Sequence, residues 1–178
     1  MNRIFSVVFF LSITSGLLAQ KITPQDEGSK VKFVINNFGI GTGGTFTGLA
    51  GSIVYDPANP TGSTFDVTVD ASTIDTDIEG RDNHLRKSEY FDVKNHPRIS
   101  FKSTRVTKTN DPAFLYMFGN VTIKGITKEV KFPFSVTAKN GGYLFAGSFP
   151  LNRRDFNLGG RSLSLSDNLQ VELSVLAK

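Results

Sequence analysis

The sequence lacks cysteine entirely and contains only two histidines, His84 and His96, in 178 residues. Without cysteine there is no disulfide, no thiolate metal site and no cysteine nucleophile. The two histidines show none of the short-range spacing that is typical of a metal site. The serine-nucleophile signature Gly-x-Ser-x-Gly is also missing. We therefore predict no metal, no cofactor and no catalytic residue, and a protein that is not an enzyme.

Clusters of basic residues are missing as well. The chain has 20 Lys and Arg against 16 Asp and Glu, which gives a net charge of +4 and a pI of 9.4. The bases are dispersed, without the stripe that tracks phosphates along a nucleic acid. This pattern predicts no nucleic-acid partner, and only a mild attraction to anionic surfaces.

Long hydrophobic runs are limited to the N-terminus. Arg3 is the only charge before Lys21, residues 4–13 are almost all apolar, and the small residues Ser15, Gly16 and Ala19 follow. A positive start, a short apolar run and small residues at its end are typical of a secretory signal peptide. The run is shorter than the roughly 20 residues of a membrane-spanning helix. We predict a signal peptide over residues 1–20 and a single periplasmic or secreted domain over residues 21–178; a buried N-terminal helix is the alternative.

The rest of the chain shows alternating apolar and polar residues. Val31, Phe33 and Ile35 share one face, for example, with Lys30 and Lys32 on the other. Such runs predict about eight strands with short connections, hence antiparallel neighbours. The strands are expected near residues 31–35, 46–55, 65–69, 99–103, 114–124, 130–136, 143–149 and 169–175, with a turn at the glycine-rich residues 39–44.

One segment breaks the alternation. Residues 78–93 carry charges without a period of two, and Ile78, Leu85 and Phe91 fit one helical face. We predict a short helical insert there, between the third and fourth strands. Eight antiparallel strands avoid exposed edges best by closing into a barrel. The pattern alone leaves open whether the apolar, Phe-rich interior is a filled core or holds one slender ligand.

The chain resembles the YceI-like family in five stretches that follow the family's order. The resemblance extends over about residues 30–175, and its central block is long enough to be specific. The stretches are Thr-Ile-Asp-Thr at 73–76, Asn-His-Leu-Arg-Lys-Ser-Glu-Tyr-Phe-Asp-Val at 83–93, Pro-Arg-Ile-Ser-Phe-Lys-Ser at 97–103, Ile-Lys-Gly-Ile-Thr-Lys at 123–128 and Asn-Arg-Arg-Asp-Phe at 152–156.

The resemblance implies an all-β, antiparallel, lipocalin-like eight-strand barrel around an apolar cavity, with the helical insert rimming or plugging one end. It also implies a periplasmic or secreted binding protein for an isoprenoid lipid, either a polyprenyl lipid or an isoprenoid quinone, which would serve transport, storage or stress protection. The residues expected to form the cavity wall are Phe33, Ile35, Phe65, Val67, Phe101, Phe132, Phe134, Phe145 and Leu173. The residues expected to meet a ligand head group at the mouth are Arg81, His84, Arg86 and Arg153.

Other functions stay open at this point. The protein could act through its surface, as a stress-related or structural protein with no bound lipid. It could be an outer-membrane barrel, although Asp66, Lys131 and Glu172 would then have to face inward. A hydrolase based on His84 is the enzymatic alternative, but no spacing assembles a nucleophile, a base and an orienting group. Transient membrane contact and a homodimer are further partner hypotheses that the sequence leaves open.

Overall fold

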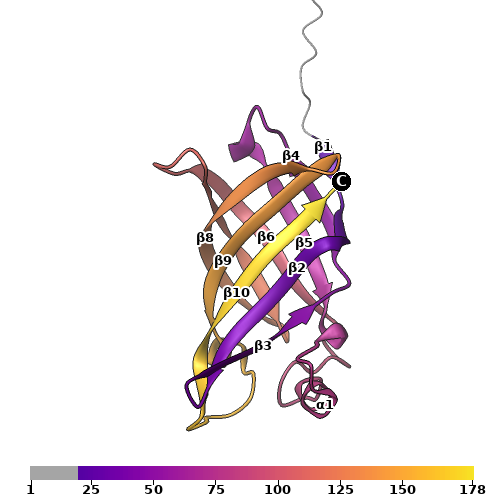
Figure 1. Cartoon of the computed structure of the whole chain (residues 1–178), viewed down its shortest axis with the longest axis vertical. Coiled ribbons are helices and arrows are strands. Elements are labelled where there is room, and N and C mark those ends of the chain that lie inside the picture. Colours follow the sequence, from indigo (N-terminus) through magenta and orange to yellow (C-terminus); the bar gives the residue numbers. More distant parts are fainter. Residues whose placement is uncertain (1–19) are drawn as a thin grey trace, which may run out of the picture.

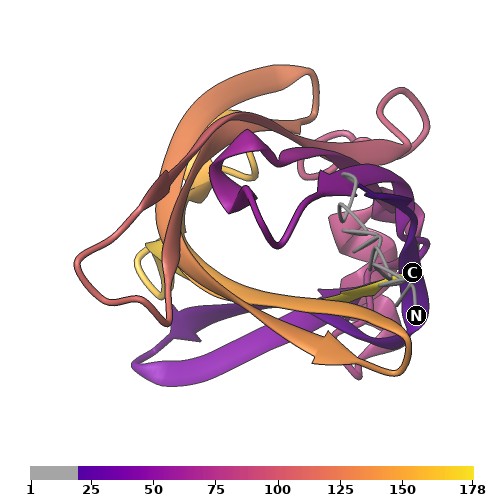
Figure 2. The same ribbon diagram turned by 90° about the horizontal axis from the view of Figure 1, so that it is seen from above.

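In the computed structural model, which describes residues 20–178, ten antiparallel strands form one curled sheet. Figure 1 shows the strands crossing the long axis at a tilt, and Figure 2 shows the sheet curling round on itself. The order across the sheet is β1-β4-β5-β6-β7-β8-β9-β10-β2-β3. The strands are β1 (Gln20–Ile22), β2 (Pro24–Asn37), β3 (Ile40–Phe46), β4 (Ala50–Tyr55), β5 (Thr64–Asp70), β6 (Arg98–Lys108), β7 (Leu115–Ile123), β8 (Ile126–Lys139), β9 (Gly142–Asn152) and β10 (Leu165–Ala177).

The first two strands join the two sides of the sheet. β1 pairs with β4, whereas β2, which begins after the single residue Thr23, pairs with β10 and β3. Between the two pairings, the backbone of Thr23 donates to the Lys178 carbonyl at 2.7 Å, and Lys178 donates back at 3.1 Å. The sheet therefore closes into a barrel at this end of the molecule, as the sequence predicted for the fold class.

The predicted alternation sets which face of each strand is buried. On β8, Val130, Phe132 and Phe134 are buried, whereas Lys131 and Pro133 between them are exposed. The inner face is thus apolar and the outer face is charged or polar. A barrel in the outer membrane needs the reverse arrangement. In the part of the chain that the structure describes, no helix is long and apolar enough to cross a membrane.

The strand count differs from the prediction, which had eight strands. The run predicted over residues 46–55 is broken at residues 47–49, and Gly48 has a φ of +70° that no extended strand allows. The glycine-rich segment, predicted as a turn, is instead the body of β3, and only Phe38 and Gly39 turn. Glycine allows this because Gly43 lies so close to Phe33 that a Cβ would stand 2.1 Å from its carbonyl oxygen. The short strand β1 accounts for the remaining difference.

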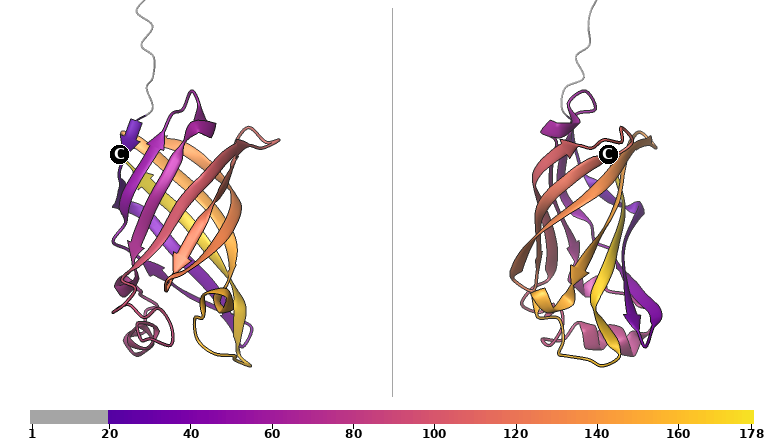
Figure 3. Two further views of the ribbon diagram at one scale, coloured as in Figure 1. Left: turned by 180° about the vertical axis from the view of Figure 1, so that it is seen from behind. Right: turned by 90° about the vertical axis from the view of Figure 1, so that its left-hand side faces the viewer.

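The helical insert lies where the sequence placed it, between β5 and β6. It contains one α-helix, α1 (Glu79–Leu85), at one end of the barrel (Figure 3). The buried Asp82 carboxylate accepts hydrogen bonds from the Thr76 backbone N–H and hydroxyl, which tie α1 to the segment before it. Arg86 donates to the carbonyls of Ser72 and Ile74. Three short 3-10 helices, Pro60–Gly62, Ala71–Thr73 and Arg153–Phe156, complete the helical structure of the described residues.

The predicted signal peptide falls on residues 1–20, of which 1–19 lie outside the described residues. Gln20, the last residue of that prediction, is the first residue of β1 and pairs with Tyr55. The signal peptide stays a prediction.

Candidate ligand cavity

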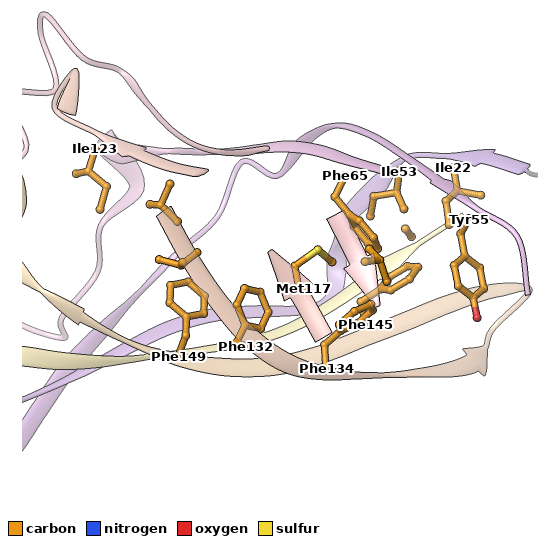
Figure 4. Close-up of a cluster of buried hydrophobic side chains, with 14 of the residues drawn as sticks. Ile22, Ile53, Tyr55, Phe65, Met117, Ile123, Phe132, Phe134, Phe145 and Phe149 are labelled. Carbon is orange, nitrogen blue, oxygen red and sulfur yellow. The ribbon is translucent and has the colours of Figure 1, made fainter. Parts of the chain in front are cut away.

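The end of the barrel opposite α1 is packed shut by aromatic side chains. Tyr55 meets the ring of Tyr143 edge-on at 4.7 Å and that of Phe145 at 5.4 Å, centroid to centroid. Phe65 meets Phe145 at 5.2 Å and Phe134 at 5.8 Å, again edge-on. Figure 4 shows Tyr55, Phe65, Phe134 and Phe145 near Ile22 and Ile53 at one end of the cluster. Edge-to-face aromatic contacts and the burial of Tyr55, Phe65, Phe134 and Phe145 make this end a packed core.

Beyond this packed end the interior is hollow. A cavity of about 510 Å³ extends from Phe65 and Phe134 toward the helical insert. Its size lies within the range of roughly 300–1,000 Å³ that is usual for small-molecule sites. Of the two readings that the sequence left open, the structure thus supports an interior with room for a ligand over an interior that is filled throughout.

All nine residues that were predicted for the cavity wall line this cavity. They come from six strands, and the largest of them are phenylalanines. Phe132 stacks on Phe149 with 4.6 Å between ring centroids, and together they form one side of the wall. The nine are Phe33, Ile35, Phe65, Val67, Phe101, Phe132, Phe134, Phe145 and Leu173. Whether they touch a ligand stays a prediction.

Several residues that line the cavity were not predicted from the sequence. Phe149, Val171 and Val175 follow the same alternation as their predicted neighbours, so the pattern could have found them. Tyr90 has no such signal, because it lies in a turn after α1 where no period applies. Phe91, which was predicted to share a helical face with Ile78 and Leu85, lies instead in a turn after α1. It also lines the cavity, and its ring meets that of Phe46 edge-on at 5.5 Å.

The mouth of the cavity lies at the α1 end. The helical insert and the loop of residues 157–164 meet there, and the Gly159 N–H donates to the Glu89 carbonyl at 2.8 Å. Gly159 has a φ of +70°, and a Cβ on it would stand 2.7 Å from the Tyr90 ring. Glycine is therefore required where the loop crosses Tyr90. The residues of the insert that line the cavity here include His84, Leu85, Tyr90 and Phe91.

Three of the four predicted head-group residues line the cavity, and one does not. Arg81 and His84 line it from α1, and Arg153 lines it from the opposite wall. Arg86 is absent from the lining, since its guanidinium is held by backbone carbonyls outside the barrel. Arg81 also makes hydrogen bonds within the protein: its Nε donates to the Thr76 hydroxyl at 2.8 Å and its Nη2 to the Thr76 carbonyl at 2.6 Å. The imidazole of His84 packs against the Tyr90 ring at 5.0 Å.

Arg153 is the most buried of these four side chains. It is only 3% exposed, and its guanidinium donates to the carbonyls of Ser166, Leu158 and Gly160 at 2.8–2.9 Å. Its Nη2 lies 2.6 Å from the Asp167 carboxylate, an ion pair without the in-line geometry of a hydrogen bond. Arg153 thus holds both ends of the loop at the mouth. The guanidinium that was predicted to meet a head group therefore binds backbone carbonyls and Asp167 instead.

One polar atom at the mouth has no partner. Asn37 lines the cavity, and its Oδ1 is buried without a hydrogen-bond donor in residues 20–178. A buried acceptor without a donor is costly, so such an atom usually has a role. In the same part of the chain no three His, Asp or Glu side chains are placed to hold a metal ion.

The comparisons with known proteins agree with this geometry. The model of the YceI-like domain matches residues 22–177. A UPF0312 protein of Pectobacterium atrosepticum is 30% identical over 161 residues, which cover 86% of this chain and 83% of that protein. The chain belongs to the YceI-like family. Another family member, protein YceI of Salmonella agona, is 28% identical over 180 residues, covering 96% of this chain and 92% of that protein.

Solved structures share the fold. BcnA of Burkholderia cenocepacia superposes with a TM-score of 0.81 at 23% identity, covering 87% of this chain and 99% of that one. A domain of Saccharophagus degradans, described as polyisoprenoid-binding and implicated in plant cell wall breakdown, superposes with a TM-score of 0.67 at 10% identity. It covers 88% of this chain and 97% of that domain. These likenesses show that the chain has a YceI-like fold.

Proposed function

We propose that this YceI-like protein binds one chain-like apolar lipid of the isoprenoid class, a polyprenyl lipid or an isoprenoid quinone, inside the barrel. The observation that carries the proposal is the cavity itself, which is walled by phenylalanine and aliphatic side chains. Burying an apolar tail there would contribute roughly 0.8 kcal/mol per methylene group. The polyisoprenoid-binding neighbour of the same fold supports this choice of ligand class.

The two ends of the cavity give the ligand a direction. At the closed end the cavity is lined by the apolar side chains of Ile53, Phe65, Phe134 and Phe145, so the end of the tail would stop there. The polar end of the lipid would then lie at the mouth, near His84 and Asn37. A head group with a hydroxyl would supply the donor that Asn37 Oδ1 lacks.

The predicted signal peptide supports a place for this binding outside the cytoplasm. A carrier that shields an apolar tail from water would be useful in the periplasm or in the medium, where the lipid has to cross an aqueous space between membranes. Transport, storage and protection of the lipid are all consistent with such binding.

The proposal is tested by filling the cavity. Val171 lines the cavity from β10, and its neighbour Glu172 faces outward and is exposed. We expect Val171→Trp, or the smaller change Val171→Phe, to lower the affinity for octaprenol at least about tenfold, because the new ring occupies the space of the tail. The matched control Glu172→Trp adds the same ring outside the barrel and should bind like the parent. Equal affinity in all variants would contradict binding in the cavity.

The alternative is a protein that acts through its surface with no lipid. It predicts that the parent protein neither retains nor takes up octaprenol, and that all of these variants behave alike.

A further inference from the structure

Three large apolar side chains project into solvent at the mouth of the cavity. Phe38 is 80% exposed, Ile40 is 72% exposed and Leu163 is fully exposed. Phe38 lies in the β2–β3 turn, Ile40 begins β3 directly after it, and Leu163 belongs to the loop before β10. The two segments lie side by side, since the Phe38 N–H donates to the Ser164 carbonyl at 2.8 Å. We call Phe38, Ile40 and Leu163 the apolar tip.

The β2–β3 turn is built with an unsuitable residue for its backbone. Phe38 and Gly39 join paired residues Asn37 and Ile40, and their φ angles are both positive, at 52° and 76°. Two positive φ angles are the mark of a type I′ turn, which favours Asn-Gly or Asp-Gly. A bulky residue in the left-handed region is a true outlier. Turn formation therefore does not explain the phenylalanine.

The same chain provides a comparison. The β8–β9 hairpin turns through Asn140 and Gly141, with φ angles of 51° and 77°, which match those of Phe38 and Gly39 within one degree. That turn carries the preferred asparagine. The β2–β3 turn, with the same backbone, carries an exposed aromatic ring instead. A strained residue that a better one could replace points to a task other than folding.

The apolar tip adjoins the cavity. Asn37, Ser162 and Ser164 all line the cavity mouth, and they are the sequence neighbours of Phe38 and Leu163. None of the three tip residues lines the cavity itself. The apolar tip therefore lies just outside the cavity mouth. A surface that contacts the tip will also face the mouth.

The charges around the tip suit a lipid surface. The sequence has no charged residue between Lys32 and Asp56, the stretch that contains the β2–β3 turn. Between Asp155 and Asp167 the only charge is that of Arg161, which is exposed. Apolar side chains that enter the acyl boundary, with a cation at the level of the head groups, are typical of proteins that bind membranes at the interface.

We infer that the apolar tip inserts into the surface of a lipid bilayer and turns the cavity mouth toward the membrane. The inference rests on the proposed function, because a barrel that carries an isoprenoid tail must collect it from a bilayer. With the mouth against the bilayer, the tail would move from one apolar medium to the other without crossing water, whose contact with apolar surface is unfavourable. The closed, aromatic end would point away into the solution.

The test uses the variant Phe38→Asn/Ile40→Thr/Leu163→Ser and vesicles of phosphatidylethanolamine and phosphatidylglycerol. We expect the parent protein to float with these vesicles and the variant to bind them at least about a hundredfold more weakly, because three anchoring side chains are lost. The matched control is Phe114→Ser/Tyr116→Ser, which removes two exposed aromatic residues, one from the β6–β7 connection and one from the start of β7, at the other end of the barrel. This control should bind vesicles like the parent.

A loss of folding cannot imitate this result, because Phe38→Asn alone gives the turn its preferred residue. We expect this single variant to have a midpoint of thermal unfolding at or above that of the parent, and yet to bind vesicles at least about tenfold more weakly. A parent that does not bind vesicles, or a triple variant that binds as tightly, would overturn the inference. So would a triple variant that only converts a dimer into a monomer with unchanged vesicle binding, since the tip would then contact a second copy of the chain.

The proposed function is judged separately in the same samples. Octaprenol delivered from ethanol needs no membrane, so the triple variant should bind it as tightly as the parent. If the parent binds vesicles, the triple variant does not, and neither protein takes up octaprenol, docking stands as a property of the tip and lipid carriage fails. If both take up octaprenol and neither binds vesicles, carriage stands and docking is overturned.

Discussion

Replacing Arg153 distinguishes a scaffolding arginine from a ligand-binding one. The structure assigns its guanidinium to the loop at the mouth, through three carbonyls and Asp167. We expect Arg153→Met, which keeps an unbranched side chain in the buried site, to destabilise the fold. The size of the effect depends on whether water can replace each lost hydrogen bond.

The magnitude comes mainly from the three carbonyls. The bond to Leu158 is buried, so its oxygen would be left without a donor, at about 1–3 kcal/mol. The bonds to Ser166 and Gly160 are only partly buried, and water can replace them at about 1 kcal/mol each. Asp167 is half exposed and adds little. The total is about 3–5 kcal/mol, or a fall of roughly 6–20 °C in Tm for a domain of this size.

The assay is urea unfolding of Arg153→Met and Arg153→Lys, combined with octaprenol titration. Lysine keeps the charge but not the planar fork that reaches several carbonyls at once, so we expect it to recover little of the stability. An Arg153→Met protein as stable as the parent that has lost lipid binding would refute this reasoning, and would return Arg153 to the role of a head-group ligand.

Three further predictions concern the ends of the barrel. Asp82→Ala leaves the buried Thr76 N–H without an acceptor and should cost about 1–3 kcal/mol in urea unfolding, whereas Asp82→Asn, which keeps an acceptor oxygen, should cost less. Hydrogen bonds from the Ser72 hydroxyl and backbone lower the pKa of Asp70, so the stability they add is present above about pH 4 and is lost as the pH falls through the lowered value; the gap in unfolding free energy between the parent and Ser72→Ala should close in acid. Burial raises the pKa of Tyr55, so the stability that its protonated form adds is present below about pH 10 and is lost as the pH rises through the raised value; Tyr55→Phe should remove a high-pH phase from an ultraviolet titration of the tyrosines.

The sequence predicted most of the fold because alternation reports directly on burial. The residues placed on the inner face, such as Phe33, Phe101 and Leu173, line the cavity, since a period of two leaves only one inner face to choose. The division into strands was less predictable. The interruption of the strand at Gly48 and the glycine-rich strand β3 both depend on backbone conformation and on how closely neighbouring backbones approach. Composition does not reveal either.

The mouth was the least predictable part. Arg86 and Arg153 look like head-group ligands in the sequence, because an arginine near the end of a helix or strand is compatible with either a ligand or a carbonyl. Only the three-dimensional arrangement shows that both are occupied by backbone oxygens. The rim formed by Phe38 and Leu163 depends on two segments far apart in the sequence, and no local pattern brings them together.

The central claim, that the barrel carries an isoprenoid lipid, is tested most directly by mass spectrometry of an organic extract. The protein would be purified without detergent from its native host, so that a natural ligand is neither displaced nor replaced. We expect one polyprenyl or quinone species in near-stoichiometric amount, and none from the Val171→Trp variant. An extract without such a species, from a parent protein that also fails to take up added octaprenol, would contradict it.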